Sequence, residues 1–353
     1  MDIIRSVQQQ KHCDGNYLPK VVVVVVHTKN LDNTVECLES LFLSNYANST
    51  FIICDNNSNV SLSDHLVERI RAVTNYSVNI LTKADLSELS DVSIDDINII
   101  RCGQNLGYAA AANLGFILAL KDTSTKYVWL LNDDVAVEPS CLKHMISRSE
   151  AVPNAGICGS RCVYYDNSDR IQALGGGKFF RWSGRSALIG NMSQADIVVN
   201  QTRIEQELDF VFGASMLVSR SFLENVGLMS EDYFIYCEEP DWAMRGRDRW
   251  AFLYSHDAII FHKGGSTIGT GTSLATTSPI AEFYMLRSRL IFTRKFFPAS
   301  LVSVWAFNVL RAMRALALGY PSITLALLTA LAGFRYKGCA LPGRRNNHAY
   351  PVA

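Results

Sequence analysis

Residues 21–26 read Val-Val-Val-Val-Val-Val, an unbroken run of β-branched side chains. Such a run predicts a strand that is buried on both faces, and strands of this kind belong to parallel sheets. Residues 33–43 carry apolar side chains at helical spacing behind a polar cap, and they predict a helix. Residues 51–54 form a second apolar run, which ends in the polar turn Asp55-Asn56-Asn57-Ser58. Polar side chains therefore stand at a strand's carboxyl end, where open α/β sheets bind ligands.

The alternation of strands and helices continues to about residue 155. Residues 97–101 and 127–131 predict two further buried strands. Residues 107–120, which include four consecutive alanines, and residues 140–149 predict helices. The stretch before them is more variable, and within residues 62–96 we expect a helix at 64–73 followed by a loop. The pattern predicts an α/β fold with a doubly wound, mostly parallel sheet.

The final part of the chain is apolar and basic. A helix is expected at residues 281–297, and two apolar helices follow at 301–318 and 323–334. A membrane span needs about 20 mostly apolar residues, so we expect a hairpin lying in the membrane plane and no span. No acidic residue follows Glu282, which suggests contact with an anionic membrane surface. The alternative is an ordinary solvated helical appendage. The basic residues in this part are Arg287, Arg289, Arg294, Lys295, Arg311, Arg314, Arg335, Lys337, Arg344 and Arg345.

Composition limits the class of protein. Of the 353 residues, 48% are apolar and 19% are charged, which permits a sizeable core and argues against global disorder. The formal net charge is zero, so nothing in the overall balance calls for a nucleic-acid partner. The nine cysteines form no paired C-x-x-C sets, which argues against structural zinc, and free thiols favour a reducing cytoplasm. Residues 1–20 are polar and contain no secretory signal.

Asn132-Asp133-Asp134 directly follows the strand predicted at residues 127–131. Two adjacent carboxylates repel one another and are costly at a buried position unless a cation or hydrogen-bond donors compensate. Mg²⁺ and Mn²⁺ take oxygen ligands, usually one or two carboxylates together with substrate phosphates. The sequence thus predicts a cation site suited to a nucleotide diphosphate. The competing interpretation is a polar cap for the helix expected from residue 140.

A second acidic cluster contains Glu238, Glu239 and Asp241 among aromatic residues. A carboxylate partly buried among aromatic rings has a raised pKa and suits a general base. The alternative is an acidic first helical turn favoured by the helix dipole. His262 follows the apolar strand expected at residues 258–261 and would complete a metal shell as a neutral imidazole, or else is a satisfied histidine at a strand end.

Two other segments point to a ligand. Asp55 would accept the imide N–H of a uracil or thymine base, or would cap the turn that follows it. Asn105-Leu106-Gly107-Tyr108 precedes the alanine-rich helix, and its glycine allows the backbone to approach a ligand closely. The segment is neither a Rossmann fingerprint nor a P-loop, since G-x-G-x-x-G and G-K-[ST] are both absent.

Taken in order, these clusters resemble the family 2 glycosyltransferases, in particular the rhamnosyltransferase-like branch. The resemblance covers roughly residues 21–295 and is carried by the ordered set of motifs. They are the valine strand, Asp55-Asn56-Asn57-Ser58, Asn105-x-Gly107-Tyr108-Ala109, Asn113-x-Gly115, Leu130-Leu131-Asn132-Asp133-Asp134, Phe212-Gly213-Ala214-Ser215-Met216, Arg220, Gly227, Tyr233-Phe234-Ile235-Tyr236-x-Glu238-Glu239-x-Asp241, His262-x-Gly264-Gly265-Ser266 and Tyr284-x-x-Arg287.

The resemblance implies a GT-A fold, a divalent metal (Mg²⁺ or Mn²⁺) and a single-displacement, inverting mechanism. It assigns the metal to Asp134, with Asn132 and His262 as further ligands. It gives the base position to Glu239, with Glu238 and Asp241 as alternatives because the family usually has aspartate there. The donor-binding residues that it implies are His27, Asp55, Asn57, Asn105, Gly107, Asp133, Gly213 and Ala214.

The same resemblance implies how the chain is divided and what it acts on. We expect a polar extension at 1–20, a nucleotide-sugar-binding half at 21–155, an acceptor-binding and catalytic half at 156–297, and the helical tail at 298–353. The expected donor is a nucleotide-diphosphate sugar, with rhamnose as the sugar that the family favours. The expected acceptor is a saccharide or lipid-linked saccharide in surface polysaccharide synthesis, at the inner face of the cell membrane.

Two other classes of protein stay open. A sugar-phosphate nucleotidyltransferase also combines an α/β sheet with a metal, but it typically has an N-terminal glycine-rich loop that residues 21–30 lack. A saccharide-binding protein without activity would not need the carboxylates and His262.

Overall fold

The computed structural model describes residues 18–57, 59–90, 92–94, 96–264, 269, 273–337 and 339. Most of the expected N-terminal extension lies outside these residues. So do Gly265 and Ser266 of the His262 motif, and Arg344 and Arg345 of the tail.

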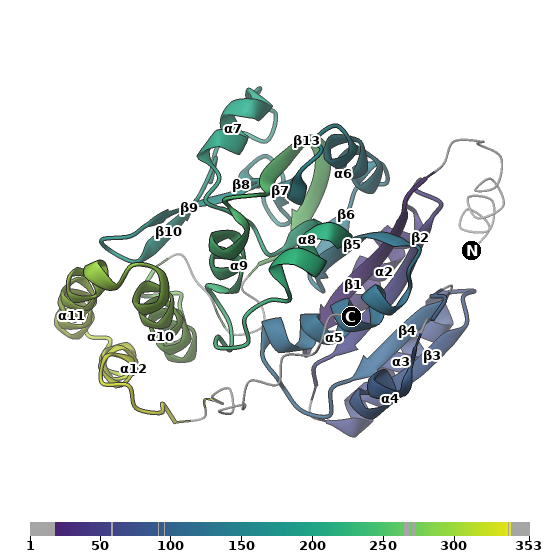
Figure 1. Ribbon diagram of the computed structural model, residues 1–353. Coiled ribbons are helices and arrows are strands. Elements are labelled where there is room, and N and C mark those ends of the chain that lie inside the picture. Colours follow the sequence, from purple (N-terminus) through teal and green to yellow (C-terminus); the bar gives the residue numbers. More distant parts are fainter. Residues whose placement is uncertain are drawn as a thin grey trace.

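A central sheet runs through the described part of the chain (Figure 1). Its strand order is β3-β4-β2-β1-β5-β12-β7-β13-β6, and β8 pairs with β7. The strands from β3 to β5 are parallel, whereas β12 and β6 run antiparallel to their neighbours, so the sheet is mostly parallel as predicted. A small second sheet has the order β10-β9-β11. The bounds are β1 Lys20–His27, β2 Ser49–Asp55, β3 Val78–Thr82, β4 Ile97–Arg101, β5 Thr125–Asn132, β6 Val135–Val137, β7 Ala155–Tyr164, β8 Ile171–Leu174, β9 Gly176–Phe180, β10 Arg185–Leu188, β11 Phe210–Val211, β12 Ser215–Ser219 and β13 Ala251–His262.

The valine run forms β1, which lies between β2 and β5 and is buried along residues 21–27. Alternate valines enter two separate cores, because successive side chains of a strand point to opposite faces. Residues 21, 23 and 25 pack beneath helices α2, α3 and α6, and residues 22, 24 and 26 pack beneath α4, α5, α8 and α9. These helices are α2 Leu31–Phe42, α3 Val60–Val73, α4 Lys83–Glu88, α5 Tyr108–Lys121, α6 Cys141–Glu150, α8 Arg220–Val226 and α9 Glu238–Gly246.

The alanine-rich helix α5 lies unusually close to the sheet. A Cβ atom on Gly115 would lie 2.5 Å from Cγ1 of Val24 and 3.1 Å from Sγ of Cys54. The small side chains therefore permit the close approach that carries the amino end of α5 to the carboxyl edge of β1.

The three C-terminal helices form a separate group beside the sheet (Figure 1). They are α10 Pro279–Phe296, α11 Leu301–Ala317 and α12 Pro321–Leu331, with a 3₁₀ turn at Pro298–Ser300. The remaining helix, α7 Gln201–Glu207, packs against β13 of the central sheet. The three C-terminal helices share a small core that includes Phe283, Leu286, Ala312 and Leu327. The helical appendage is therefore confirmed. No helix in the described residues is both long enough and apolar enough to cross a bilayer.

The expectation of a loop after the helix predicted at residues 64–73, which is α3, was wrong. Residues 78–82 form the edge strand β3, and residues 83–88 form the short helix α4. Strand β3 escaped prediction because its side chains are mostly exposed and show no apolar run. A capping box of Thr82 and Asp85 begins α4, and this signal was present in the sequence. Likewise, the residues after Asp134 form the strand β6 before α6 begins at Cys141, so the two aspartates do not cap that helix.

We predict that Gly115→Val destabilises the protein. The added side chain must displace Val24 or lift α5, and overpacking of this kind lowers the free energy of unfolding by about 1–3 kcal/mol. Ala306→Val, at an exposed position of α11, is the control and should change the free energy of unfolding by less than about 0.5 kcal/mol. Urea denaturation compares the two, and equal stability would contradict the close packing of α5 on β1.

Candidate active site

A cavity of about 650 Å³ opens at the carboxyl edge of β1 and β5. Most of the predicted site residues line it, although they come from distant parts of the sequence. The lining includes Asn105, Gly107, Asn132, Asp133, Asp134, Gly213, Ala214, Glu238, Glu239 and His262. Four predicted site residues are not in the lining, namely His27, Asp55, Asn57 and Asp241.

Asp133 is fixed by donors from the first strand and helix. Its Oδ2 accepts hydrogen bonds from the backbone N–H of Thr28 (3.1 Å) and from the Thr34 hydroxyl (3.3 Å). His27 lies behind it, with Nδ1 2.7 Å from Oγ1 of Thr34 and 3.5 Å from the same carboxylate oxygen. His27 therefore supports Asp133 from below and does not reach the cavity.

Asp134 and His262 both line the cavity, and Oδ1 of Asp134 lies 3.1 Å from Nε2 of His262. The other ring nitrogen, Nδ1, lies 2.7 Å from Oε1 of Gln172, which also accepts from the Cys162 thiol. An amide oxygen cannot donate, so Nδ1 carries a proton and donates it to Gln172. The lone pair of a neutral ring is then directed from Nε2 toward the Asp134 carboxylate, and two electron-rich atoms at this distance need a proton or a cation between them.

These groups fit a divalent cation whose coordination shell is completed by oxygen atoms of a substrate. Among the described residues, no group of three or more His, Cys, Asp or Glu side chains is arranged to hold a metal by itself. Asp134 and His262 offer two ligands, and the Asn132 amide lies 3.4 Å from Nε2 of His262. Mg²⁺ and Mn²⁺ bind in this manner when phosphate oxygens complete the shell. A metal-binding histidine usually donates its second ring N–H to an acceptor, which fixes the tautomer and the orientation of the ring. The hydrogen bond from His262 to Gln172 is of this kind.

The acidic pair Glu238 and Glu239 stands at the start of α9 and lines the same cavity as the aspartates. Tyr236 and Cys237, directly before it, both have φ of 69°, a left-handed conformation that is strained for residues other than glycine. Burial raises the pKa of Glu239 to about 7, although the Gly213 N–H donates to its carboxylate and opposes the rise. Burial and the charge of Glu239 raise the pKa of Glu238 well above its usual value.

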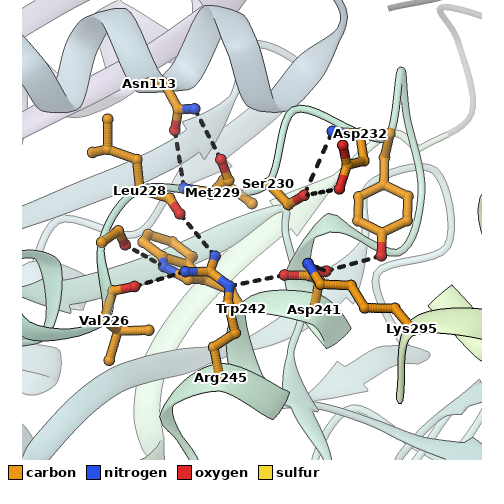
Figure 2. Close-up of polar contacts among 12 residues, drawn as sticks. Asn113, Val226, Leu228, Met229, Ser230, Asp232, Asp241, Trp242, Arg245 and Lys295 are labelled. Atoms are coloured by element: carbon orange, nitrogen blue, oxygen red, sulfur yellow. Dashed lines mark hydrogen bonds and ion pairs between the residues drawn. The ribbon is translucent and has the colours of Figure 1, made fainter. Parts of the chain in front are cut away.

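Asp241 lies in the same helix but does not line the cavity, and Figure 2 shows its polar contacts. Its Oδ1 accepts from Nε of Arg245 (2.9 Å), and its Oδ2 accepts from the Tyr233 hydroxyl (2.9 Å) and from Nζ of Lys295 (2.6 Å). Arg245 also donates to two carbonyl groups of the segment 226–228. Both oxygens of Asp241 are thus occupied, and the residue anchors α9 to its surroundings.

The turn after β2 contributes a residue that the sequence did not single out. The Asn56 side chain accepts from the Leu106 N–H (2.8 Å) and donates to Gly107 O and to the Asn105 side chain (both 3.2 Å). It thereby joins the two loops at the sheet edge. Its neighbour Asp55 is 1% exposed and accepts from the Asn57 N–H, so the predicted contact of Asp55 with a base stays a prediction.

Two glycines allow the loops to approach. Gly107 has φ of 86°, and a Cβ there would lie 2.4 Å from the Phe234 carbonyl oxygen. A Cβ on Gly213 would lie 2.1 Å from Oε1 of Glu239. The Tyr108 hydroxyl donates to the Gly213 carbonyl (3.0 Å) and ties the same two loops together.

A cationic side chain at the rim was also missed. Lys263 lines the cavity, and its Nζ donates to Glu36 (2.6 Å) and Asn33 (2.9 Å). Its backbone N–H donates to the Asp134 carbonyl. Its place directly after His262 was the signal in the sequence that could have identified it. Gln172 had no such signal, because it is 90 residues away from the histidine that it orients.

Comparison with known proteins identifies relatives of this chain. The sequence model described as "Glycosyl transferase family 2" matches residues 21–226, which is more than half of the 353 residues. The low-salt glycan biosynthesis hexosyltransferase Agl10 of Haloferax volcanii is 25% identical over 184 residues, which cover 52% of this chain and 56% of the relative. The N-acetylglucosaminyl-diphospho-decaprenol L-rhamnosyltransferase of Mycobacterium tuberculosis is 28% identical over 189 residues, which cover 49% of this chain and 61% of the relative. The match therefore spans little more than half the length of either relative.

A solved structure supports the fold. GalNAc-T7, determined with UDP, GalNAc and Mn²⁺, superposes with a TM-score of 0.53 at 13% sequence identity, covering 80% of this chain and 48% of that one. The predicted GT-A fold class is confirmed.

We predict that Gln172→Leu weakens Mn²⁺ binding. Without its acceptor, the His262 ring loses its fixed tautomer and orientation, and a loss of this kind costs about 10–100-fold in metal affinity. Titration of Mn²⁺ followed by electron paramagnetic resonance, with a nucleoside diphosphate present, measures the affinity. Gln206→Leu, at an exposed position of α7, should leave it unchanged. Equal affinities in the two folded variants would exclude His262 as a ligand.

Proposed function

The chain belongs to glycosyl transferase family 2, and from that premise we propose that it is an inverting, metal-dependent glycosyltransferase. In this proposal it takes a sugar from a nucleotide-diphosphate donor and transfers it to a saccharide or lipid-linked saccharide. One observation carries the proposal: Asp134, His262 and the acid Glu239 line the same cavity. Asp134 and His262 suit the leaving group, and Glu239 suits the attacking group.

Glu239 is the proposed general base. With a pKa of about 7, it is largely ionised just above neutral pH and is a stronger base than an exposed glutamate. Its own backbone N–H and that of Gly213 donate to the carboxylate and orient it. In this orientation the carboxylate would accept the proton of the acceptor hydroxyl while the hydroxyl oxygen attacks the anomeric carbon.

The two other acids suit the role less well. Glu238 is 2% exposed, and its Oε2 has no hydrogen-bond partner among the described residues. Burial and the charge of Glu239 raise its pKa well above the usual value, which favours the protonated form, and that form is not a base. Asp241 is held by Arg245, Tyr233 and Lys295 outside the cavity.

The leaving-group side of the cavity is assigned to Asp134, His262 and Asn132, which would hold the divalent cation. A bound cation would neutralise the negative charge that grows on the diphosphate as the sugar departs. Asp133, fixed by Thr28 and Thr34, keeps a second negative charge beside this position. Lys263 stands at the rim, where its ammonium group would contact a phosphate oxygen.

Rhamnose is our proposed donor sugar, since one relative is an L-rhamnosyltransferase. The same relative acts on a lipid-linked acceptor, as its name states, and this supports a lipid-linked acceptor here. The expected contact with an anionic membrane at the inner face of the cell membrane belongs to this proposal.

We predict that Glu239→Gln lowers turnover at least about 100-fold, because a general base usually contributes a rate enhancement of at least this size. Metal-dependent release of nucleoside diphosphate from a panel of nucleotide sugars is the measurement. Because the wild-type base must be ionised, kcat/KM should fall as the pH falls below about 7 and should level off above it. Asp241→Asn is not a suitable control because that residue anchors α9, so Glu88→Gln, at an exposed position of α4, is used. Undiminished turnover by folded Glu239→Gln would move the base elsewhere.

The same assay distinguishes the other two classes of protein. A nucleotidyltransferase would exchange pyrophosphate in place of releasing nucleoside diphosphate, and a saccharide-binding protein would release nothing. Either result would overturn the proposed function.

The membrane contact is attributed to the outer face of α11. Leu310, Met313 and Leu316 are 64%, 62% and 60% exposed, although they belong to an otherwise well-packed helix. Exposed apolar side chains beside basic ones favour the surface of an anionic bilayer.

We predict that replacing these three residues together with serine lowers binding to vesicles containing phosphatidylglycerol at least about tenfold, because the apolar area that enters the bilayer is lost. The control replaces Leu43, Leu62 and Ile80 with serine. These residues are also exposed, at 41%, 46% and 40%, but lie on the sheet domain. Co-sedimentation measures binding, and an equal effect of the two triple variants would refute the role of α11.

A further inference from the structure

A second cavity, of about 820 Å³, lies among the three C-terminal helices. We call it the helical groove; α10 supplies one wall, and α11 and the end of α12 supply the other. These helices gather on one side of the sheet domain (Figure 1). The proposed transfer reaction does not use this groove.

The α10 wall combines cations with apolar side chains. Arg287, Leu290, Ile291 and Arg294 line the groove at i, i+3, i+4 and i+7, so they share one face of the helix. The two arginines are therefore about 10 Å apart along the axis, with the apolar pair between them. Arg294 is exposed and has no hydrogen-bond or ion-pair partner within the described part of the chain. Nη1 of Arg287 donates to the Asp232 carbonyl at 3.5 Å, a long hydrogen bond.

The opposite wall is apolar. Leu301 and Trp305 of α11 line it together with Ala330 and Leu331 of α12, and Trp305 is 48% exposed. A half-exposed tryptophan beside cations is a feature of surfaces that bind amphiphiles, since the ring contacts an apolar chain and the cations bind an anion.

The charges at the rim also favour an anion. Lys295 lines the groove but is engaged with the buried Asp241 (Figure 2). Asp232 is the acid in the lining, and its carboxylate accepts from the Ser230 hydroxyl. Arg287 and Arg294 place positive charge at the two ends of the α10 face, so the lining contains more cationic than acidic side chains.

Other occupants suit the groove less well. The end of the chain, residues 340–353, carries Arg344 and Arg345 and no acid, so it has the same charge sign as the groove. The C-terminal helices of a second copy would bring the same basic residues. A small soluble anion would not use the apolar walls.

We propose that the helical groove binds one lipid by its phosphate-bearing head and the first part of its apolar chain, and that this lipid is the carrier of the acceptor. The assignment of the carrier rests on the proposed function. A single segment separates the groove from the candidate active site. Asp232 lines the groove, Phe234 and Tyr236 line the catalytic cavity, and the Ser288 hydroxyl of α10 donates to the Ile235 carbonyl between them. A saccharide attached to a head group in the groove would therefore have one loop to cross.

Farnesyl diphosphate, a water-soluble isoprenoid diphosphate, is the probe. Titration calorimetry on the full chain is done with a chelator present, so that metal-dependent binding of a diphosphate at the catalytic cavity does not contribute. We expect saturable binding by the wild type and by Asp134→Asn. Farnesol alone and pyrophosphate alone should each bind at least about tenfold more weakly, because each satisfies only one part of the groove.

Arg294→Gln should weaken the binding of farnesyl diphosphate about tenfold, the usual effect of losing one charge-assisted contact, and Arg294→Lys should recover most of it. Arg314→Gln is the matched control because Arg314 is exposed on α11 outside the groove, and it should change affinity less than about twofold. Equal weakening by both glutamine variants would show unspecific attraction and would overturn the proposal. Equal or tighter binding of dihexanoyl phosphatidylglycerol would overturn the assignment to a carrier lipid in favour of bulk membrane lipid.

Release of nucleoside diphosphate, measured on the same samples, distinguishes the two proposals. If the wild type releases nucleoside diphosphate but does not bind farnesyl diphosphate, the groove proposal fails and the proposed function stands. If farnesyl diphosphate binds as expected but no donor is turned over, the lipid site is supported, and its assignment to an acceptor carrier fails with the proposed function.

Discussion

The candidate site depends on two adjacent carboxylates held at a buried sheet edge. Asp133 and Asp134 are 7% and 6% exposed, and like charges at this depth repel one another strongly unless donors or a cation compensate. Asp133 receives the Thr28 N–H and the Thr34 hydroxyl, and Oδ1 of Asp134 lies 3.1 Å from Nε2 of His262. A divalent cation held by Asp134 and His262 would offset the repulsion between the two carboxylates, and this links the fold to the chemistry that we propose.

The same constraint applies to the acids at the start of α9. Glu238 and Glu239 share a buried helix start, and burial raises the pKa of both. The rise favours the protonated form of each acid, while the Gly213 N–H donates to the Glu239 carboxylate and opposes the rise there. Asp241, three positions after Glu238, is neutralised by Arg245 and Lys295 and stabilises the helix that presents the pair. We therefore propose different roles for Glu238, Glu239 and Asp241, because their surroundings differ although they are neighbours in the sequence.

Much of this arrangement could be predicted from the sequence, because it depends on local pattern. The valine run, the alternation of strands and helices and the acids at strand ends all have local signals. What could not be predicted depends on contacts between distant segments. Gln172 orients His262 from 90 positions away, and Asn56 joins two loops 50 residues apart. Strand β3 lacks a buried run because it lies at the sheet edge, and the separation of Asp241 from the cavity depends on Lys295, 54 residues further along the chain.

The central claim is that Asp134 and His262 hold a diphosphate through a cation, and the affinity for a nucleoside diphosphate with and without Mn²⁺ tests it most directly. Calorimetry on the wild type and on Asp134→Asn gives the four dissociation constants. The account predicts that Mn²⁺ tightens binding to the wild type at least about tenfold and has little effect on the variant. Binding that is equally tight without the metal, or that gains equally from it in the variant, would contradict the account.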